Sequence, residues 1–434
     1  MQLYRRPTPP NGFPTDKWKT VSKTAEELVE AELKKLKGKK PVAAKKGRKG
    51  AAKTGKKIEV FPGIWKDFKA FFSYAQFGKC GFCESPILDT YPGDVEHYRP
   101  KSAISALRDD VDDALGQQQE ALAGVTGRLT ELVSSTGYYW LAYDWKNYLL
   151  ACSICNGLKG TIFPVKDNPR IVPPLRDNST EHALLLNPYD KKVPASHLKF
   201  QPNGFVQSKT LYGRATIETC GLYREQLRKS RLDIALRAYE LGRDLKRPVN
   251  KRDRHVLRDC YDLGADDARH CGMVRSILEE VTATSWKMLV MQYAEELALE
   301  SKRTRNAETK KEIDRRLEKM GRERFEYSSE VREIFEKVRG ISWGKLIERH
   351  AQQFASDFMA CKKDWQKDAD YQLSWKLDFY MLARDNLSHV AIVKEAYEKK
   401  SRMDWNELKA EVEAKYKFLW KLPEDNPSAT SSAA

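Results

Sequence analysis

The sequence predicts an α+β fold, with a compact loop-rich region in its first half and a mainly α-helical second half. Two cysteine pairs, Cys80-Gly-Phe-Cys83 and Cys152-Ser-Ile-Cys155, lie in the first region, which is rich in Tyr, Trp, Pro and turn residues. Beyond about Leu211, apolar residues recur at helical spacing within long charged stretches. We therefore expect a metal-stapled domain over residues 58–210 and an α-helical domain over residues 211–422.

The composition is that of a globular protein. With 434 residues, of which 41% are hydrophobic and 32% charged, the chain is long enough for two or three domains. No apolar run approaches the roughly 18 residues that span a bilayer. The first residues also lack the apolar segment of a secretory signal. These observations predict a cytoplasmic protein with no membrane partner.

Positive charge is concentrated near the N-terminus. We expect an arm and a short helix over residues 1–33, and then a disordered Lys-rich tether over residues 34–57, because this run contains twelve Lys or Arg and no acid. The formal net charge is +16, and subtracting these twelve leaves about +4 for the rest of the chain. The tether fits either a hold on the nucleic-acid backbone or a solvated linker.

Three further segments have distinct compositions. Residues 106–136 are acidic and then amphipathic, which predicts a helical insertion within the first domain. Residues 306–324 are almost entirely charged, which indicates an exposed helix or a long connector. The last residues, 423–434, are expected to form a disordered tail.

The two CxxC pairs are typical of a structural zinc site. A two-residue spacer lets both thiolates of a pair reach one tetrahedral Zn²⁺, so Cys80, Cys83, Cys152 and Cys155 are the expected ligands. The gap of 68 residues between the pairs is longer than in an ordinary zinc ribbon. The alternatives are a redox motif, which would need a thioredoxin-like context that is absent here, and two unrelated structural pairs.

Residues suited to phosphodiester hydrolysis lie between and within these pairs. The block DVEHYRPKS places a carboxylate, Glu96, beside an imidazole, His97, which can act as a general base near neutral pH. Asn156 directly follows Cys155 and adds a second hard oxygen, so Glu96 and Asn156 are candidate ligands of a catalytic Mg²⁺ or Mn²⁺. A zinc ion bound at Cys155 would also hold Asn156 in place.

The pattern CxxCE, then VEHYRPKS, then NYLLACSICNGLKG, resembles the HNH endonuclease family with its ββα-metal fold. The resemblance implies that His97 is the general base and that Glu96 and Asn156 are metal ligands. It further implies that Asn147 braces the loop carrying the catalytic histidine. Glu96 stands where Asp is commoner and Asn156 stands where His is common, and both substitutions retain an oxygen ligand.

The likeness extends over Phe71 to Ala235, through the blocks GYYWLAYDWKNYLLAC, KGTIFPV, LLLNPYD and ATIETCGLYREQLRKSRLDIA. These blocks resemble the HNH nuclease subunit of Septu-type anti-phage defence systems and of related retron systems. The resemblance implies an ABC/SMC-like ATPase as a partner. The tether, the insertion and the helical second half lie outside it.

Three basic residues near the motif are candidate contacts to nucleic acid, namely Arg99, Lys101 and Lys159. DNA is the expected partner, and the composition does not distinguish it from RNA. Two other functions stay open. One is a stand-alone restriction-type HNH endonuclease, and the other is a zinc-stabilised nucleic-acid-binding protein without catalytic activity.

Overall fold

The computed structural model describes residues 2–7, 9–10, 13–37, 61–87, 93–107, 130–134, 136–166, 181–190, 196–248, 255–365 and 369–415. The chain divides into two compact units. Unit 1 comprises Met1–Arg247 and Leu263–Val281, and unit 2 comprises Pro248–Asp262 and Thr282–Ala434. The predicted boundary after residue 210 therefore falls inside unit 1.

Unit 1 begins with an arm and a long helix, α1 (Asp16–Lys37). One stripe of this helix is buried, formed by Trp18, Ala25 and Val29 at helical spacing. The helix is longer than predicted, because it includes the first residues of the Lys-rich segment. The rest of the expected tether, residues 38–57, lies outside the described residues.

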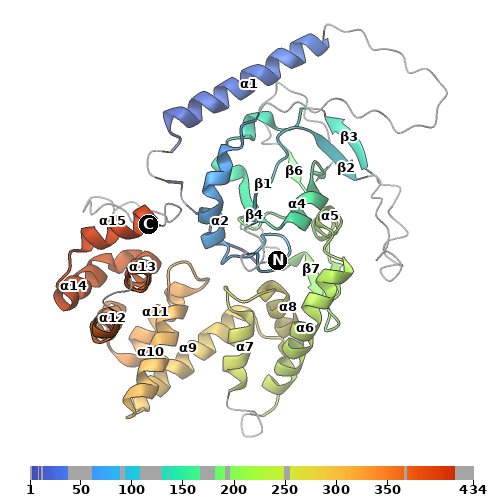
Figure 1. Cartoon of the computed structure of the whole chain (residues 1–434). Helices are drawn as coiled ribbons and strands as arrows, with labels where there is room; N and C mark the ends of the chain where they lie inside the picture. Colours follow the sequence, from blue (N-terminus) through green and yellow to red (C-terminus); the bar gives the residue numbers. More distant parts are fainter. Residues whose placement is uncertain are drawn as a thin grey trace. The chain divides into compact units, whose positions relative to one another are not determined.

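An antiparallel strand pair followed by a helix forms the centre of unit 1 (Figure 1). Strand β1 (Asp94–His97) pairs with β4 (Tyr148–Ala151), so that His97 lies opposite Tyr148. Every residue of β4 is buried, and the chain then enters α4 (Ser153–Lys159). Gly160 ends this helix at a positive φ of 47°, which glycine adopts without strain.

The remaining strands of unit 1 form three further two-stranded pairs. These pairs are β2 (Ile104–Leu107) with β3 (Thr130–Ser134), β5 (Val165–Lys166) with β6 (His182–Ala183), and β7 (Leu198–Phe200) with β8 (Val206–Ser208).

The predicted helical insertion over residues 106–136 is wrong at its two ends. Strands β2 and β3 occupy these ends and pair with each other, and residues 108–129 lie outside the described part of the chain. Ser105 also forms a parallel bridge with Ile162, and its N–H donates to the carbonyl of Thr161 at 2.8 Å. These long-range pairings outweigh the local helical preference on which the prediction relied.

The helices of unit 1 flank this centre. They are η1 (Ile64–Phe68), α2 (Lys69–Ala75), η4 (Tyr139–Leu141), η5 (Trp145–Asn147), α5 (Leu211–Cys220), α6 (Glu225–Leu245) and α8 (Cys271–Thr282), and α7 (Val256–Gly264) spans a boundary between the units. Helix α5 packs against α4 and β8. This packing explains why residues after 210 belong to the same unit as the cysteine pairs.

An aromatic cluster supports the strand pair from behind. The ring of Phe68 packs between those of Trp18 and Trp145, with its centroid 4.9 Å from the ring of Trp18 and 5.0 Å from that of Trp145. The arm joins this cluster, since Trp145 Nε1 donates to the carbonyl of Pro7 and Arg6 donates to the carbonyl of Tyr148. The N-terminal arm is therefore part of the core that positions η5 and β4.

Unit 2 is helical throughout its described residues, as the sequence predicts. Its elements are α9 (Trp286–Arg303), α10 (Ala307–Met320), α11 (Ser328–Arg339), α12 (Trp343–Trp365), α13 (Ala369–Asp385), η8 (Leu387–His389), α14 (Val390–Ser401) and α15 (Trp405–Lys415). Trp343, Phe335 and Tyr397 are buried in its core. The expected tail, residues 423–434, lies outside the described residues.

Helix α10 confirms the helical alternative predicted for residues 306–324, but one face of it is buried rather than exposed. Ile313, Leu317 and Met320 lie on one face and are almost fully buried. Three apolar residues at helical spacing are enough to dock a helix whose other positions are charged.

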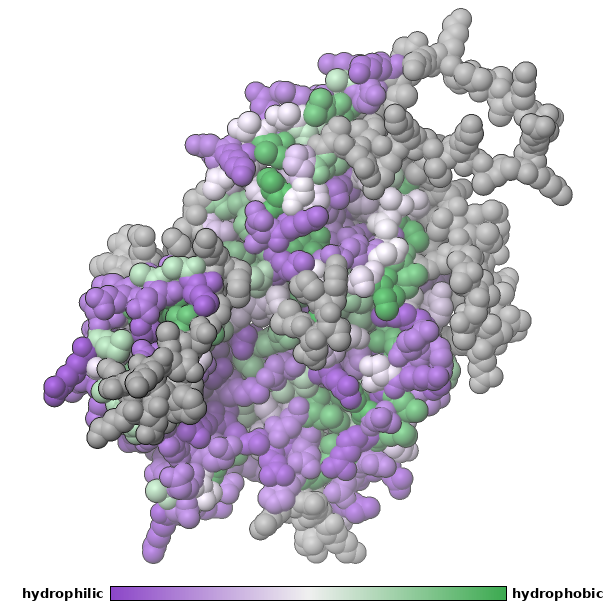
Figure 2. Space-filling model, viewed as in Figure 1, coloured by the Kyte–Doolittle hydropathy of each residue, from purple (hydrophilic) through white to green (hydrophobic). Residues whose placement is uncertain are grey.

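Hydrophilic residues predominate on the molecular face seen in Figure 2, with hydrophobic residues in smaller groups between them. Among the described residues, no helix has the length and apolar character that crossing a membrane requires.

Candidate active site and metal centre

The four predicted cysteine ligands come together in unit 1. The sulfur atoms of Cys80, Cys83, Cys152 and Cys155 all lie within 4.8 Å of one another, and those of Cys83 and Cys152 are 3.9 Å apart. Four thiolates around one zinc ion lie about 3.8 Å apart, given Zn–S distances of about 2.3 Å. The cluster therefore has the geometry to hold a tetrahedral metal ion such as zinc.

The local chain geometry favours this arrangement. Cys152 caps helix α4, and its sulfur accepts a hydrogen bond from the N–H of Cys155 at 3.4 Å. Hydrogen bonds among the four thiols lower the pKa of Cys83 and of Cys152 and raise the pKa of Cys155, and burial raises the pKa of Cys80. Two of the four thiols thus favour the thiolate form that binds a metal. Arg224 adds a positive charge, because its Nη1 lies 3.6 Å from the sulfur of Cys155.

A distant segment of unit 1 holds the first cysteine pair in place. His270 Nδ1 lies 3.0 Å from the carbonyl oxygen of Cys83, and the N–H of Gly272 donates to the carboxylate of Glu84 at 2.7 Å. Glu84 is almost fully buried, so this donor offsets part of the desolvation of its charge. The start of α8 is therefore a structural support of the metal centre.

Strand β1 directs two carboxylates toward helix α4. Asp94 and Glu96 are two residues apart and lie on the same face of the strand. Asn156 Nδ2 donates to Asp94 at 3.1 Å, and Lys159 Nζ donates to Glu96 at 2.7 Å. Asn156 and Lys159 are three residues apart on α4, so the two contacts are successive links between the strand and one face of the helix.

Burial of Lys159 contradicts its predicted contact with nucleic acid. Its side chain is fully buried, and its ammonium group donates to Glu96 and, at 2.8 Å, to the carbonyl of His97. A buried carboxylate needs a partner charge, and Lys159 supplies it. Its role is to position β1 against α4.

His97 lies at the end of β1 with one ring nitrogen occupied. Its Nε2 is 2.9 Å from the carbonyl oxygen of Ala142, and the ring packs edge-on against Trp65 and Tyr148. Because a carbonyl only accepts, Nε2 carries the proton and Nδ1 keeps the lone pair. No hydrogen bond to Nδ1 is found within the described part of the chain.

The environment keeps His97 neutral. Burial, together with the positive charge of Lys101 and of Lys159, holds the pKa of His97 well below its ordinary value. A neutral imidazole with a fixed tautomer is the form that can accept a proton.

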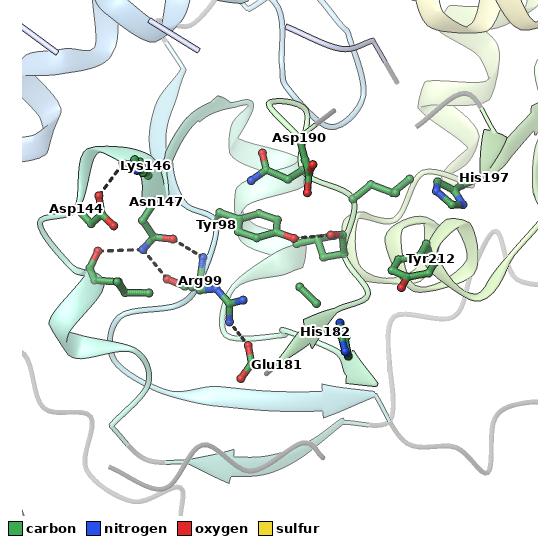
Figure 3. Close-up of a pocket in the computed structure, with 15 residues that line it drawn as sticks. Tyr98, Arg99, Asp144, Lys146, Asn147, Glu181, His182, Asp190, His197 and Tyr212 are labelled. Carbon is green, nitrogen blue, oxygen red and sulfur yellow. Dashed lines mark hydrogen bonds and ion pairs between the residues drawn. The ribbon is translucent and has the colours of Figure 1, made fainter. Parts of the chain in front are cut away.

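Asn147 braces the chain segment that follows His97 (Figure 3). Its Oδ1 accepts from the N–H of Arg99 at 2.7 Å, and its Nδ2 donates to the carbonyls of Arg99 and Leu141, each at 3.0 Å. Leu141 precedes Ala142, whose carbonyl holds His97. One buried amide therefore ties together the two segments that orient the imidazole.

Arg99 is engaged within the protein. Its guanidinium forms an ion pair with Glu181, and both side chains are largely buried (Figure 3). The group also lies 4.9 Å from the ring centroids of Tyr138 and Phe163. Glu181 thus compensates the charge of Arg99, and the predicted contact of Arg99 with nucleic acid stays a prediction.

Lys101 lies closer to the histidine. Its ammonium is 4.5 Å from the ring centroid of Trp65, the residue that packs on His97, and the side chain is half-buried. Its charge also acts on the imidazole, as the pKa of His97 indicates. Its predicted contact with nucleic acid stays a prediction.

Three groups at the site were not predicted as functional. Asp94 could have been found, because the alternation in Asp94-Val95-Glu96 places both carboxylates on one face. No sequence pattern pointed to Arg224 or to the carbonyl of Ala142, because both act through contacts between distant segments.

Hard oxygen donors lie on β1 and α4, apart from the four cysteines. In the described ranges, the four cysteines form the one group of three or more His, Cys, Asp or Glu able to hold a metal. Asp94, Glu96 and the amide of Asn156 nevertheless offer oxygen ligands in adjacent positions. Mg²⁺ is commonly bound by one or two carboxylates, with water and substrate completing its shell.

Part of the chain is similar in sequence to a known protein. The chain resembles the Septu protein PtuB of Bacillus mycoides (strain KBAB4). It is 34% identical to that protein over 161 residues, which is 36% of this chain and 47% of PtuB. The chain thus matches about half the length of this curated relative.

Other comparisons returned no match. No protein-family model matches the chain, and no solved structure matches it.

Proposed function

We propose that this chain is a metal-dependent endonuclease of the HNH type that hydrolyses phosphodiester bonds of DNA. The observation that carries the proposal is the antiparallel pair β1–β4 running into α4, with His97 fixed in one tautomer by Ala142. An imidazole held in this way, beside a set of hard oxygen ligands, suits the activation of water for attack on phosphate.

His97 acts as the general base in this proposal. Its Nδ1 takes a proton from water, the water oxygen bonds to phosphorus, and the bond from phosphorus to the leaving sugar oxygen breaks. That oxygen takes a proton from solvent. Asn147 is a positioning residue, because it holds the segments on both sides of the imidazole.

Two metals have separate roles. Asp94, Glu96 and Asn156 would hold a Mg²⁺ or Mn²⁺ ion, which when bound neutralises charge developing on the phosphate and the leaving oxygen. Lys159 holds the Glu96 carboxylate toward α4. The four cysteines would hold a structural Zn²⁺ that clamps α4, and with it Asn156, against the first cysteine pair.

Plasmid cleavage tests the catalytic assignment. Purified protein is incubated with supercoiled plasmid and Mg²⁺ or Mn²⁺, and the products are separated by gel electrophoresis. The protein is expected to nick or linearise the plasmid. The cleavage rate of His97→Ala is expected to be about 100- to 10,000-fold lower than that of the wild type, because a positioned general base contributes a factor of this size.

The matched control is His389→Ala in unit 2. His389 is half-buried, and its ring forms a hydrogen bond with Ser388. Its replacement therefore shows the effect of losing a histidine that is not on β1. The control is expected to cleave at the wild-type rate. Cleavage by His97→Ala at that rate would rule out the assignment.

We further propose that the chain is the nuclease effector of a Septu-like anti-phage defence complex with an ABC/SMC-like ATPase partner. The likeness to Septu protein PtuB supports this role. Expression of the chain with its neighbouring genes in a phage-sensitive bacterium is expected to lower phage plating, and the His97→Ala variant is expected to abolish protection. A tagged chain should retain the ATPase during purification.

A stand-alone restriction-type nuclease is the alternative. It would cleave DNA equally well after separation from every partner, and deletion of the ATPase gene would leave phage plating unchanged.

A further inference from the structure

A cavity of about 650 Å³ opens in unit 1 beside the segment that Asn147 braces (Figure 3). Tyr98 and Arg99 line it, directly after the strand that carries His97. Its volume lies within the range of small-molecule sites, roughly 300–1,000 Å³. Asn147 and Leu141 also line it, so the cavity adjoins the segments that orient His97.

One side of the cavity is an aromatic surface. The rings of His197 and Tyr212 lie 5.2 Å apart and are tilted by 41°, and both side chains are half-buried (Figure 3). His197 Nδ1 lies 2.8 Å from the hydroxyl of Thr210, and partial burial lowers the pKa of His197, which favours the neutral ring. Two flat neutral rings at a cavity wall are suited to stacking on a planar ring.

Another part of the lining carries an exposed cation. Lys146 is exposed, and its N–H, not its ammonium group, bonds to Asp144. Figure 3 shows Lys146 and Asp144 on the side away from Tyr212. Lys146 can therefore contact one phosphate while a ring occupies the interior.

The charges of the lining exclude a polyphosphate. Three carboxylates line the cavity, from Asp144, Glu181 and Asp190, against two permanent cations, Arg99 and Lys146. Glu181 already compensates the charge of Arg99. A nucleoside triphosphate would place several negative charges beside these carboxylates, whereas a base with a single phosphodiester would not.

We propose that this cavity receives one unstacked nucleobase of the nucleic-acid strand that the enzyme cleaves, with Tyr212 and His197 as the stacking surface and Lys146 on the adjoining phosphate. The proposal rests on the proposed nuclease function, whose candidate base lies one residue before Tyr98. It assigns a substrate class: a base inside a duplex cannot enter, so a single-stranded or unpaired segment is the preferred substrate.

Equilibrium binding tests the proposal separately from cleavage. Fluorescence anisotropy of a labelled single-stranded oligothymidylate is measured without added divalent metal, beside a labelled duplex of equal length. Tyr212→Ala is expected to weaken single-strand binding about tenfold, as loss of one base–aromatic stack does, and duplex binding less than twofold. Tyr212→Phe keeps the ring and should bind as wild type.

Two controls isolate the base. Tyr239→Ala removes an exposed tyrosine from α6 and should bind as wild type. A strand whose bases are replaced by abasic residues should bind wild type and Tyr212→Ala equally. Lys146→Ala should reduce the salt dependence of single-strand binding, with a log–log slope smaller by about 0.7.

Several outcomes would overturn the cavity assignment. These are wild-type single-strand affinity in Tyr212→Ala, equal losses for single strand and duplex, an equal loss in Tyr212→Phe, or no single-strand binding by the wild type. If plasmid cleavage proves independent of His97 while the Tyr212 pattern holds, the proposed catalytic role fails and the base-binding site stands.

Discussion

Lys159 has a structural role, although its position in the sequence suggested a contact with nucleic acid. Its ammonium lies 2.7 Å from Glu96 and 2.8 Å from the carbonyl of His97, with no exposed surface. A buried lysine is compatible with a stable fold when an opposite charge pairs with it, because an unpaired buried charge is strongly destabilising. Glu96 and Lys159 thus fix β1 relative to α4 at the residue that precedes the proposed base.

Replacing this lysine should destabilise the protein. Lys159→Met keeps most of the side-chain volume and leaves Glu96 buried without a partner, so the free energy of unfolding is expected to fall by about 3–5 kcal/mol. Urea titration of unit 1 tryptophan fluorescence measures the change.

The double variant Glu96→Gln with Lys159→Met removes both charges and should recover a large part of the loss. Lys146→Met, at an exposed position, is the control and should change stability by less than about 0.5 kcal/mol. Equal stability of Lys159→Met and the wild type would show that the pair does not support the fold.

At the scale of elements, the site depends on how β1, β4 and α4 are held together. The register of the strand pair places His97 opposite Tyr148. Only Cys152, which caps α4, separates the end of β4 from the start of α4. The four thiols, two from the Cys80–Cys83 turn and two from the start of α4, meet beside this junction. A metal ion there would join the first cysteine pair to the helix that carries Asn156, and its binding free energy would add to folding stability.

Metal content should follow the cysteines. We expect one zinc ion per chain by mass spectrometry of the purified protein, and loss of that ion in Cys152→Ser. Strong chelators should lower the melting temperature of the wild type, because the metal-free form loses the link between two loops.

Cys260→Ser is the matched control. Cys260 is buried in unit 2 and belongs to neither pair, so this variant should keep the zinc ion. A wild-type protein that contains no zinc, or a Cys152→Ser variant that keeps it, would contradict the structural metal site.

At the scale of the whole molecule, unit 1 is discontinuous in sequence. Its last part, Leu263–Val281, follows a segment that belongs to unit 2. Within unit 1, Lys79 donates to the carbonyl of Ala268 at 2.8 Å, and Glu84 accepts from Gly272. Both charged side chains are almost fully buried. Unit 1 is therefore complete only when the chain continues past α6 to Val281.

Truncation tests this organisation. A fragment ending at Val281 contains every part of unit 1 and is expected to unfold cooperatively and to hold zinc. A fragment ending at Arg247 leaves Lys79 and Glu84 without their partners from the α8 region, and it should show no cooperative transition. Circular dichroism melting and zinc content distinguish the two fragments, and equal behaviour would contradict the assignment of Leu263–Val281 to unit 1.

The sequence by itself determined the local features of this protein. Spacing identified the four cysteines, and the structure confirms that they meet. Helical periodicity identified the second half. The alternation in β1 that places Asp94 on the same face as Glu96 is also local, although it was not used to predict Asp94. Such features follow from neighbours a few residues apart, so a linear pattern is enough to reveal them.

Only the tertiary structure decided which side chains are available. Lys159 and Glu96 are 63 residues apart, and Gly272 and Glu84 are 188 residues apart. No local pattern encodes such contacts, because they depend on how separate segments pack. Packing buried Lys159, paired Arg99 with Glu181 and paired β2 with β3. It also formed the cavity that Asn147 lines from segments that the sequence scatters between Tyr98 and Tyr212. Each buried charged side chain needs a partner of opposite charge or a hydrogen-bond partner. Lys159 and Arg99 therefore pair with Glu96 and Glu181 within the protein.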